Sequence, residues 1–274
     1  MGVVRRRLAA VLAAAVVLLC SWPAPASAVQ PLLVGGVDAD QNYPFMTALE
    51  LPSGEHLCGA SLVKPAWLVT AAHCVQGRTV DGFTARVGSK DRTQGGEAAK
   101  PAEIVVHPDY DPAGSGGDIA LVRLTAPVKA APVELGTQAA AGTATRLLGW
   151  GQTCPEQNCG PSPAVLKQLD TRIVDGKGCT GFDASVELCT GNPGGTKGAC
   201  YGDSGGPQLV RVEERWQLVG VSSRPGNDDA KCATGPSIYT SVVAYTQWIN
   251  DRTAPPPPPQ EPEPTPEPTP TPTP

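Results

Sequence analysis

The chain has 274 residues, of which 17% are charged and 5% aromatic, and its net charge is −5. That length allows one large domain or two small ones with a buried core. No cluster of Lys and Arg remains beyond the first few residues, so we expect binding neither to nucleic acid nor to an anionic membrane surface.

The first 28 residues have the pattern of a secretory signal peptide. Residues 5–7 are arginines, residues 8–20 form an apolar run too short to span a bilayer comfortably, and residues 26–28 form a small-residue cleavage site. A membrane anchor is the alternative, and a lipoprotein attached through Cys20 fits less well because Leu19 is bulky. We therefore expect a secreted, extracellular protein without stable membrane insertion. The export route, general or twin-arginine, stays open.

From about residue 33 to residue 240, short apolar runs are broken by Gly, Pro, Asn and Asp. Runs of this length and spacing are typical of an all-β protein of the sandwich or barrel type. Small residues around 138–142 mark a seam between two halves, about 33–138 and about 139–241. Apolar residues then recur at helical spacing, which predicts a short helix over residues 242–252.

Residues 253–274 have a different composition, with five consecutive prolines followed by Glu-Pro and Thr-Pro repeats. Such a segment cannot bury apolar surface and favours an extended, solvated spacer. A stalk, a linker, a substrate for O-glycosylation and an inert tail are alternatives that the sequence leaves open.

The cysteines point to an oxidising compartment. Of nine, eight lie beyond the signal peptide, and an even number in an exported chain implies disulfides. Sequence alone allows many pairings. No Cys-x-x-Cys with a partner histidine suggests zinc, so we predict no metal and no other cofactor.

One glycine-rich stretch, residues 198–207, contains a single serine, Ser204, directly after Asp203. Glycines let the backbone approach a ligand closely, and a turn N–H can point at the negative charge that develops during acyl transfer. A serine hydroxyl is a poor nucleophile unless a base activates it, and the base needs an orienting carboxylate.

The candidates for base and carboxylate are His73 and Asp118. Of three histidines, His73 follows small residues that let its imidazole face a partner, whereas His56 and His107 lie near a turn and at the end of an apolar run. Asp118 enters an apolar run, where an unpaired carboxylate is costly.

These stretches resemble the chymotrypsin/trypsin family of serine proteases. Residues 202–207 (Gly-Asp-Ser-Gly-Gly-Pro), 70–74 (Thr-Ala-Ala-His-Cys) and 118–124 (Asp-Ile-Ala-Leu-Val-Arg-Leu) match its motifs, in the family's chain order. The resemblance covers residues 33 to about 252 and is nearest to secreted bacterial members. It implies an all-β, trypsin-like fold of two six-stranded antiparallel Greek-key barrels with a C-terminal helix, and a catalytic site between the barrels.

The resemblance also implies roles for single residues. Ser204 would be the nucleophile, His73 the base and Asp118 its orienting carboxylate, with the N–H groups of Gly202 and Ser204 as the oxyanion hole. Ser222 would donate a hydrogen bond to Asp118, and residues 222–224 would pair with the substrate backbone.

Cysteine pairs and ion binding follow from the same resemblance. The implied disulfides are Cys58–Cys74, Cys179–Cys189 and Cys200–Cys232, and Cys154–Cys159 remains by subtraction. The family's calcium loop would fall near residues 89–100, but it looks shortened and has Ser89 in place of an acidic ligand, so we do not predict calcium.

Residues 33–36 (Leu-Val-Gly-Gly) resemble the start of a mature family member. The chain would then be a zymogen with a short propeptide, residues 29–32, and cleavage would release a Leu33 amino group that pairs with Asp203. Because Leu32 is not basic, we expect an activating protease unlike trypsin.

The residues expected to line the primary specificity pocket carry no acidic group. Trypsins have an aspartate six residues before the nucleophile, where this chain has Gly198; the other predicted pocket residues are Ala199, Tyr201, Ser222, Ser223, Arg224 and Ser237. Three alternatives for Arg224 are open. Its side chain would lie across the pocket and admit only small apolar side chains of the substrate, attract an acidic side chain, or point to solvent and leave room for large apolar side chains. We predict apolar specificity, small to medium before large, over acidic.

Two rival functions were weighed. An α/β-hydrolase esterase shares the Gly-x-Ser-x-Gly pattern, but it needs a histidine after the serine, and none follows Ser204. An inactive, protease-like binding protein usually lacks a triad member, and this chain has all three. We therefore predict a monomeric endopeptidase whose partners are protein or peptide substrates and protein protease inhibitors.

Overall fold

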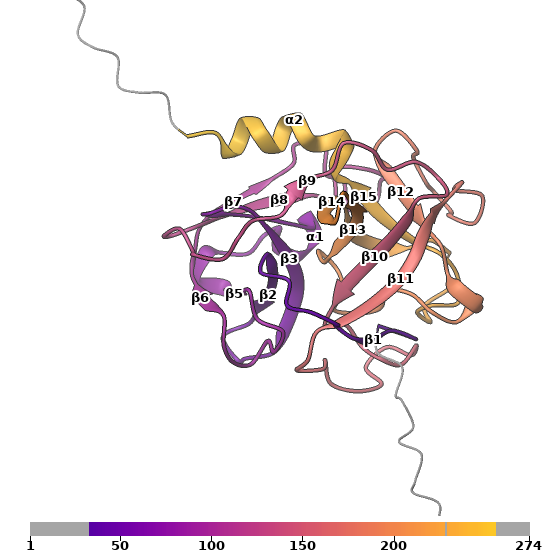
Figure 1. Cartoon of the computed structure of the whole chain (residues 1–274), viewed down its shortest axis with the longest axis horizontal. Helices are drawn as coiled ribbons and strands as arrows, with labels where there is room; N and C mark the ends of the chain where they lie inside the picture. Colours follow the sequence, from indigo (N-terminus) through magenta and orange to yellow (C-terminus); the bar gives the residue numbers. More distant parts are fainter. Residues whose placement is uncertain (1–32, 228, 256–274) are drawn as a thin grey trace, which may run out of the picture.

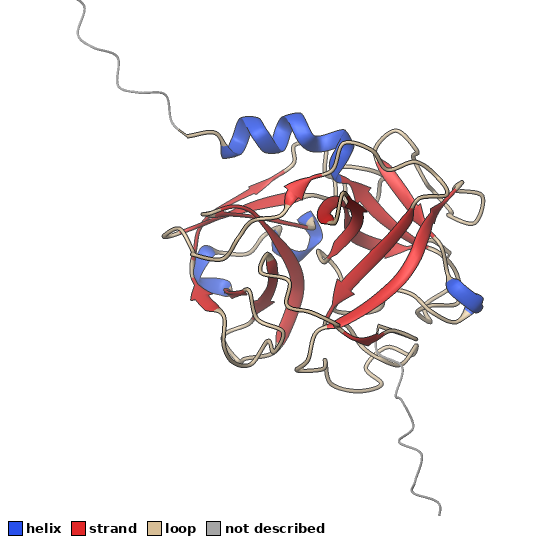
Figure 2. Ribbon diagram, in the orientation of Figure 1, coloured by secondary structure: helices blue, strands red, loops and turns tan. Residues whose placement is uncertain are grey.

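A computed structural model describes residues 33–227 and 229–255; the predicted signal peptide, the propeptide and most of the tail lie outside this range. The strands form two sheets that lie side by side (Figure 1; Figure 2). One helix, α2 (Val242–Thr253), crosses one end of the molecule, and α1 (Ala72–Val75) is a single turn between the sheets.

The first sheet is built from the N-terminal half. Its strands run in the order β6-β5-β2-β3-β4-β8-β7, all antiparallel: β2 (Met46–Glu50), β3 (His56–Lys64), β4 (Trp67–Thr70), β5 (Thr84–Val87), β6 (Glu97–Ala99), β7 (Pro101–Val106) and β8 (Ala120–Leu124). Only Lys100 separates β6 from β7, yet these strands lie at opposite edges, so the sheet curls back on itself as a half-barrel.

The second sheet closes completely. Six strands, β10 to β15, form a ring because β11 pairs with both β10 and β12: β10 (Ala144–Gly149), β11 (Lys167–Val174), β12 (Glu187–Thr190), β13 (Pro207–Val212), β14 (Arg215–Pro225) and β15 (Ser237–Ser241). Two short 3-10 turns, η1 (Val80–Gly82) and η2 (Pro193–Gly195), lie in loops. The all-β, trypsin-like fold is therefore confirmed, with a curled half-barrel in place of the first closed barrel.

Both halves exchange short segments. β1 (Val37–Asp38) pairs with β11, and β9 (Glu134–Leu135) pairs in parallel with β14, so both add a short strand to the second sheet. In return, three buried residues of α2 join the main core cluster of the first half: Val242, Tyr245 and Ile249. Such exchange fixes one sheet against the other, and the predicted triad residues His73, Asp118 and Ser204 lie at this junction.

The C-terminal helix begins and ends by local rules. The Ser241 hydroxyl accepts a hydrogen bond from the Ala244 N–H at 3.3 Å, which caps the first turn. The helix was expected over residues 242–252; it includes Thr253, the first residue assigned to the tail, which is buried. No helix in the described ranges is long and apolar enough to cross a membrane.

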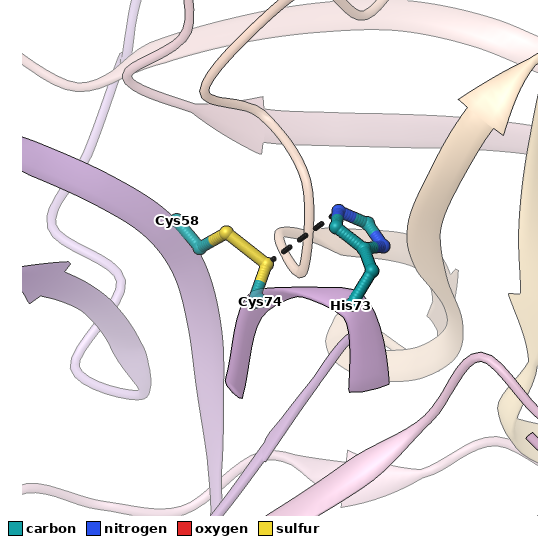
Figure 3. A group of neighbouring side chains, drawn as sticks. All are labelled: Cys58, His73 and Cys74. Atoms are coloured by element: carbon teal, nitrogen blue, oxygen red, sulfur yellow. Dashed lines mark hydrogen bonds between the residues drawn. A yellow bond between two sulfur atoms is a disulfide. The ribbon is translucent and has the colours of Figure 1, made fainter. Parts of the chain in front are cut away.

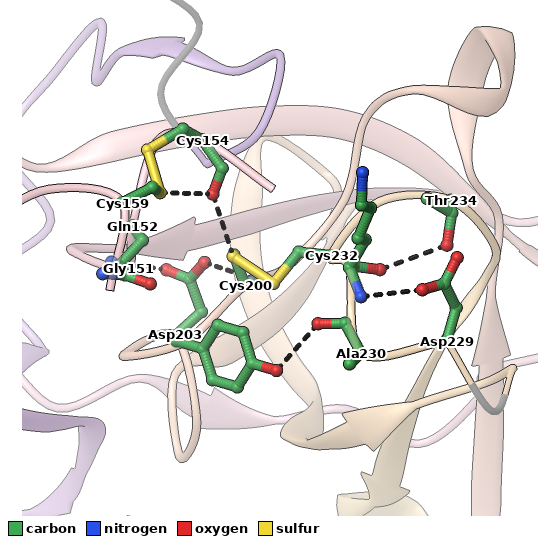
Figure 4. The surroundings of a disulfide bond; sticks show 12 residues. Gly151, Gln152, Cys154, Cys159, Cys200, Asp203, Asp229, Ala230, Cys232 and Thr234 are labelled. Atoms are coloured by element: carbon green, nitrogen blue, oxygen red, sulfur yellow. Dashed lines mark hydrogen bonds between the residues drawn. A yellow bond between two sulfur atoms is a disulfide. The ribbon is translucent and has the colours of Figure 1, made fainter. Parts of the chain in front are cut away.

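Four disulfides have the predicted pairing. Cys58–Cys74 joins β3 to α1, and Cys179–Cys189 joins a loop to β12. Cys200–Cys232 links the nucleophile stretch to the loop before β15, and Cys154–Cys159 closes a small loop beside it (Figure 4).

Closing a longer loop removes more entropy from the unfolded chain. Cys154 and Cys159 are 5 residues apart and Cys200 and Cys232 are 32 apart. Double Cys→Ser replacement should therefore lower the free energy of unfolding by about 2 kcal/mol for the short loop and about 4 kcal/mol for the long one. Urea unfolding in a Ser204→Ala background, which lacks the predicted nucleophile, measures both free energies, and an equal or reversed order would contradict the expectation.

Candidate active site

Ser204 lies where the two sheets meet. Its carbonyl accepts a hydrogen bond from the Gly59 N–H of β3 at 2.8 Å, and the next N–H, of Gly205, donates to the Ser222 carbonyl of β14 at 2.8 Å. Gly205 has a φ of +76°, and a Cβ there would stand 2.2 Å from the Thr70 hydroxyl oxygen. Only glycine allows this approach, which brings the nucleophile stretch against the strand that leads to His73.

His73 and Asp118 form a bonded pair. The Asp118 carboxylate accepts one hydrogen bond from the backbone N–H of His73 at 3.0 Å and one from its Nδ1 at 2.8 Å. A carboxylate only accepts, so Nδ1 carries the proton and Nε2 is left as an acceptor. Burial alone would raise the pKa of Asp118, but the hydrogen bonds and charge of His73, together with a hydrogen bond from Ser223, outweigh burial and hold that pKa below its ordinary value.

The serine that binds Asp118 is Ser223, which corrects the expectation for Ser222. Ser223 Oγ donates to Asp118 Oδ2 at 2.6 Å. The register of β14 against β15 shifts between Ser222 and Arg224, so Ser223 is the extra residue of a β-bulge. A bulge changes the direction of the side chain at that point, and the sequence pattern does not reveal it.

The imidazole of His73 stands beside a disulfide. Its Nε2 is 3.7 Å from Cys74 Sγ, as Figure 3 shows, and Cys74 is bonded to Cys58. Because both sulfurs are used in that bond, the cluster of Cys58, His73 and Cys74 has no free thiolate to offer a metal. Within the described ranges no hydrogen bond joins Ser204 to His73; such bonds are often long without substrate and tighten when it binds.

The predicted oxyanion donors, the N–H groups of Gly202 and Ser204, make no hydrogen bond to other described residues. The carbonyl of Gly202 is held from behind by His56, whose Nε2 donates to it at 2.9 Å. Burial lowers the pKa of His56 to about 4, so its ring is neutral at neutral pH. The sequence indicates only that His56 lies near a turn, because its contact with Gly202 spans 146 residues of chain.

Asp203 is buried in a cradle of two glycines. Its carboxylate accepts hydrogen bonds from the N–H of Gly151 at 2.8 Å and of Cys200 at 2.9 Å. A Cβ at Gly149 or Gly151 would stand 1.9 or 2.3 Å from its oxygens, so side chains are excluded there. Burial raises the pKa of Asp203 to about 7, although both N–H groups lower it.

The N-terminal segment lies against the same region. Leu33 is fully buried in one cluster with Leu147, and Val34 forms a β-bridge to Gly198, whose N–H donates to the Val34 carbonyl at 3.0 Å. The described chain therefore begins beside the stretch that carries Asp203. No cationic side chain of the described residues pairs with this carboxylate.

A pocket of about 210 Å³ opens beside Ser204. Six of the predicted residues line it together with Cys200, Pro225 and Cys232: Ala199, Tyr201, Ser222, Ser223, Arg224 and Ser237. Gly198 lies behind them, with Ser237 Oγ 3.7 Å from the point where its Cβ would be. Because of the bulge, Pro225 is the residue that faces Ser237 across the β14–β15 ladder, which sequence analysis missed.

The guanidinium of Arg224 is turned to Glu187. Its Nη1 and Nη2 donate to the two Glu187 oxygens at 2.5 and 3.0 Å, and Nη2 also donates to the Gly181 carbonyl at 2.8 Å. The positive charge of Arg224, which was expected at the pocket, is thus already paired with the Glu187 carboxylate.

A loop of residues 152–163 supports the pocket wall (Figure 4). The N–H of Cys232 donates to the Pro155 carbonyl at 2.9 Å, and the N–H of Gln152 donates to the Tyr201 carbonyl at 2.7 Å. The Tyr201 hydroxyl donates to the Ala230 carbonyl at 2.8 Å. Hydrogen bonds therefore hold the pocket wall at Tyr201 and at Cys232, on both sides of the Cys200–Cys232 disulfide.

Comparison with known proteins agrees with this geometry. The family model described as Trypsin matches residues 33–249. A "Trypsin" of Saccharopolyspora erythraea is 34% identical over 229 residues, which cover 78% of this chain and 94% of that protein. A "Tryptase" of Mus musculus is 32% identical over 243 residues, 80% of this chain and 87% of that protein. The chain belongs to the trypsin family of serine proteases.

Proposed function

We propose that the protein is a secreted serine endopeptidase whose catalytic residues are Ser204, His73 and Asp118. The observation that carries the proposal is the buried Asp118 carboxylate, which receives hydrogen bonds from His73 and Ser223 and leaves His73 Nε2 free to act as a base. Membership of the family supports hydrolysis of peptide bonds, and four disulfides suit an extracellular protein.

The mechanism follows from these positions. Ser204 Oγ attacks the peptide carbonyl carbon while His73 Nε2 takes its proton, and the oxyanion is bound by the N–H groups of Gly202 and Ser204. As the C–N bond breaks, His73 gives that proton to the departing amine. Water, activated by His73, then attacks the acyl-enzyme ester and releases Ser204. Throughout, Asp118 holds the tautomer and stabilises the imidazolium.

Ser204→Ala tests the catalytic assignment. A fluorophosphonate probe should label the mature wild-type chain on one serine, and Ser204→Ala should remove the label together with about 10⁴-fold or more of the peptidase activity. Ser53→Ala changes an exposed serine and is the matched control, which should label as the wild type does. A labelled Ser204→Ala chain would assign the reactive nucleophile to another serine, and an unlabelled wild type would favour the rival reading of an inactive binding protein.

We further propose a preference for small to medium apolar side chains before the scissile bond. Gly198 provides no charge for the Lys or Arg that a trypsin selects, so the names of the relatives do not transfer their specificity. Arg224 is already paired with Glu187, which argues against acidic substrates. Family members with open pockets have glycine where, after the bulge, this chain has Pro225, and the facing Ser237 narrows the pocket further.

Widening the pocket should change this preference. In Ser237→Gly, and more so in Pro225→Gly/Ser237→Gly, kcat/KM for a Phe substrate should rise about 10-fold or more relative to the matched Ala substrate, since each methylene admitted to a pocket is worth about 1–3 kcal/mol. Peptides that differ only at that residue provide the measurement. Wild-type cleavage mainly after Lys or Arg would refute the assignment of Gly198 as an uncharged floor.

We propose, finally, that cleavage after Leu32 activates the enzyme. The new amino group of Leu33 would supply the positive charge that the buried Asp203 lacks among the described residues, and so order the neighbouring Gly202 N–H. Buried carboxylates are costly without a partner, which couples cleavage to order.

The pH dependence of stability tests this step. In a chain that keeps residues 29–32, the raised pKa of Asp203 means that its contribution to stability is full below about pH 4 and is lost as pH rises through about 7. In a chain that starts at Leu33, the ion pair cancels that loss. The melting temperatures of the two Ser204→Ala chains should therefore diverge from pH 4 to pH 8, with that of the longer chain lower. The underlying difference in the free energy of unfolding is about 1.4 kcal/mol per pKa unit. Asp203→Asn should abolish the divergence. If the melting temperatures of the two chains that keep Asp203 change in parallel with pH, the proposal is contradicted.

A further inference from the structure

A buried carboxylate outside the triad, Glu187 at the start of β12, organises the segments around Asp118. Its side chain is completely buried, with 0% exposed, while that of Arg224 is 29% exposed. Besides both Arg224 nitrogens, Glu187 Oε1 accepts from the Gly116 N–H at 3.0 Å and Oε2 accepts from the Asp183 N–H at 2.9 Å. Every acceptor direction of the carboxylate is used, so the side chain has one orientation.

These bonds join three segments that are distant in sequence. Gly116 is two residues before Asp118, and the following N–H, of Gly117, donates to the Tyr245 hydroxyl at 2.7 Å. Arg224 directly follows Ser223, the partner of Asp118. Glu187 also faces Thr240 across the β12–β15 ladder, and the Thr240 hydroxyl donates to the Asp118 carbonyl at 2.9 Å. Glu187 therefore fixes both the backbone before Asp118 and the strand end that carries Ser223.

That strand end is also the free edge of the second sheet. Residues 224 and 225 pair with β15 on one side, whereas the β13 ladder stops at Val221, so the opposite edge of residues 223–225 faces the pocket and has no partner among the described strands. Pro225 has no N–H to donate. An extended peptide at this edge must therefore rely on few main-chain groups, and their exact position decides how well it binds.

We infer that Glu187 is a positioning residue for extended peptide substrates, acting through Arg224 on the edge formed by residues 223–225. The inference rests on the proposed peptidase function and adds to it a residue far from the pocket wall in sequence. The role of Arg224 then differs from the three expected from the sequence, which were to close the pocket, to attract an acidic side chain or to point to solvent. Through its guanidinium, the buried carboxylate of Glu187 fixes the substrate-binding edge.

Two substrates separate this role from general structural damage. One is an N-blocked single-residue ester, which reaches only the pocket, and the other is an N-blocked four-residue ester with the same final residue, which also lies along the edge. In Glu187→Gln and in Arg224→Met, the ratio of kcat/KM for the long ester to that for the short ester should fall at least ten-fold from the wild-type ratio. Arg224→Lys keeps the positive charge but loses the bidentate hydrogen bond to Glu187. Its ratio should lie between those of the wild type and Arg224→Met.

The matched control is Arg215→Met on the same strand, which breaks an exposed pair with Glu134 and should leave the ratio unchanged. If Glu187→Gln does not fold, Arg224→Met alone decides, because its side chain is partly exposed. A ratio that stays at the wild-type value, whether both esters lose kcat/KM equally or neither does, would overturn the positioning role. A wild type that fluorophosphonate does not label would overturn the proposed function and this role with it, whereas a labelled wild type separates the two.

Discussion

The structure depends on one buried charge, the carboxylate of Asp118, which lies between the two sheets with three hydrogen bonds from His73 and Ser223. A buried carboxylate is costly unless it is paired, so this geometry requires that α1 of the first half and β14 of the second half come together. The exchanged segments β1, β9 and α2 hold the halves in that relation. The geometry of the proposed triad and the packing of the two halves therefore depend on the same buried charge.

Around this charge, three further ionisable groups, two of them buried and His56 half-buried, each meet a defined partner. Asp203 lies against backbone N–H groups, His56 holds the Gly202 carbonyl, and Glu187 holds Arg224. Each contact joins segments that are distant in sequence or belong to different elements of the fold. The pocket and the nucleophile stretch are thus built mainly by polar contacts over a framework of β-strands and disulfides.

Much of this arrangement could be predicted from the sequence because its signals are local. The short apolar runs predicted an all-β fold, and the motifs at His73, Asp118 and Ser204 indicated the family. Three of the four disulfide pairs followed from the same resemblance, and Cys154–Cys159 followed by subtraction. What could not be predicted depends on register or on distant contacts. The bulge at Ser223 shifts the pairing of β14 with β15 by one residue, so that Ser223 and not Ser222 binds Asp118, and Pro225 and not Arg224 faces Ser237. The partners of His56 and Arg224 are 146 and 37 residues away, and nothing in the residues between them indicates those contacts.

The tautomers of the histidines test the central claim most directly, since the chain has only three. Asp118 requires the proton of His73 on Nδ1, whereas His56 donates from Nε2 to Gly202, and His107 Nδ1 accepts from the Asp109 N–H. Nitrogen-15 NMR of the mature chain at neutral pH should therefore show one ring with a protonated Nδ1 and two with a protonated Nε2, and Asp118→Asn should remove the first signal. A wild-type spectrum in which His73 carries its proton on Nε2 would contradict the account.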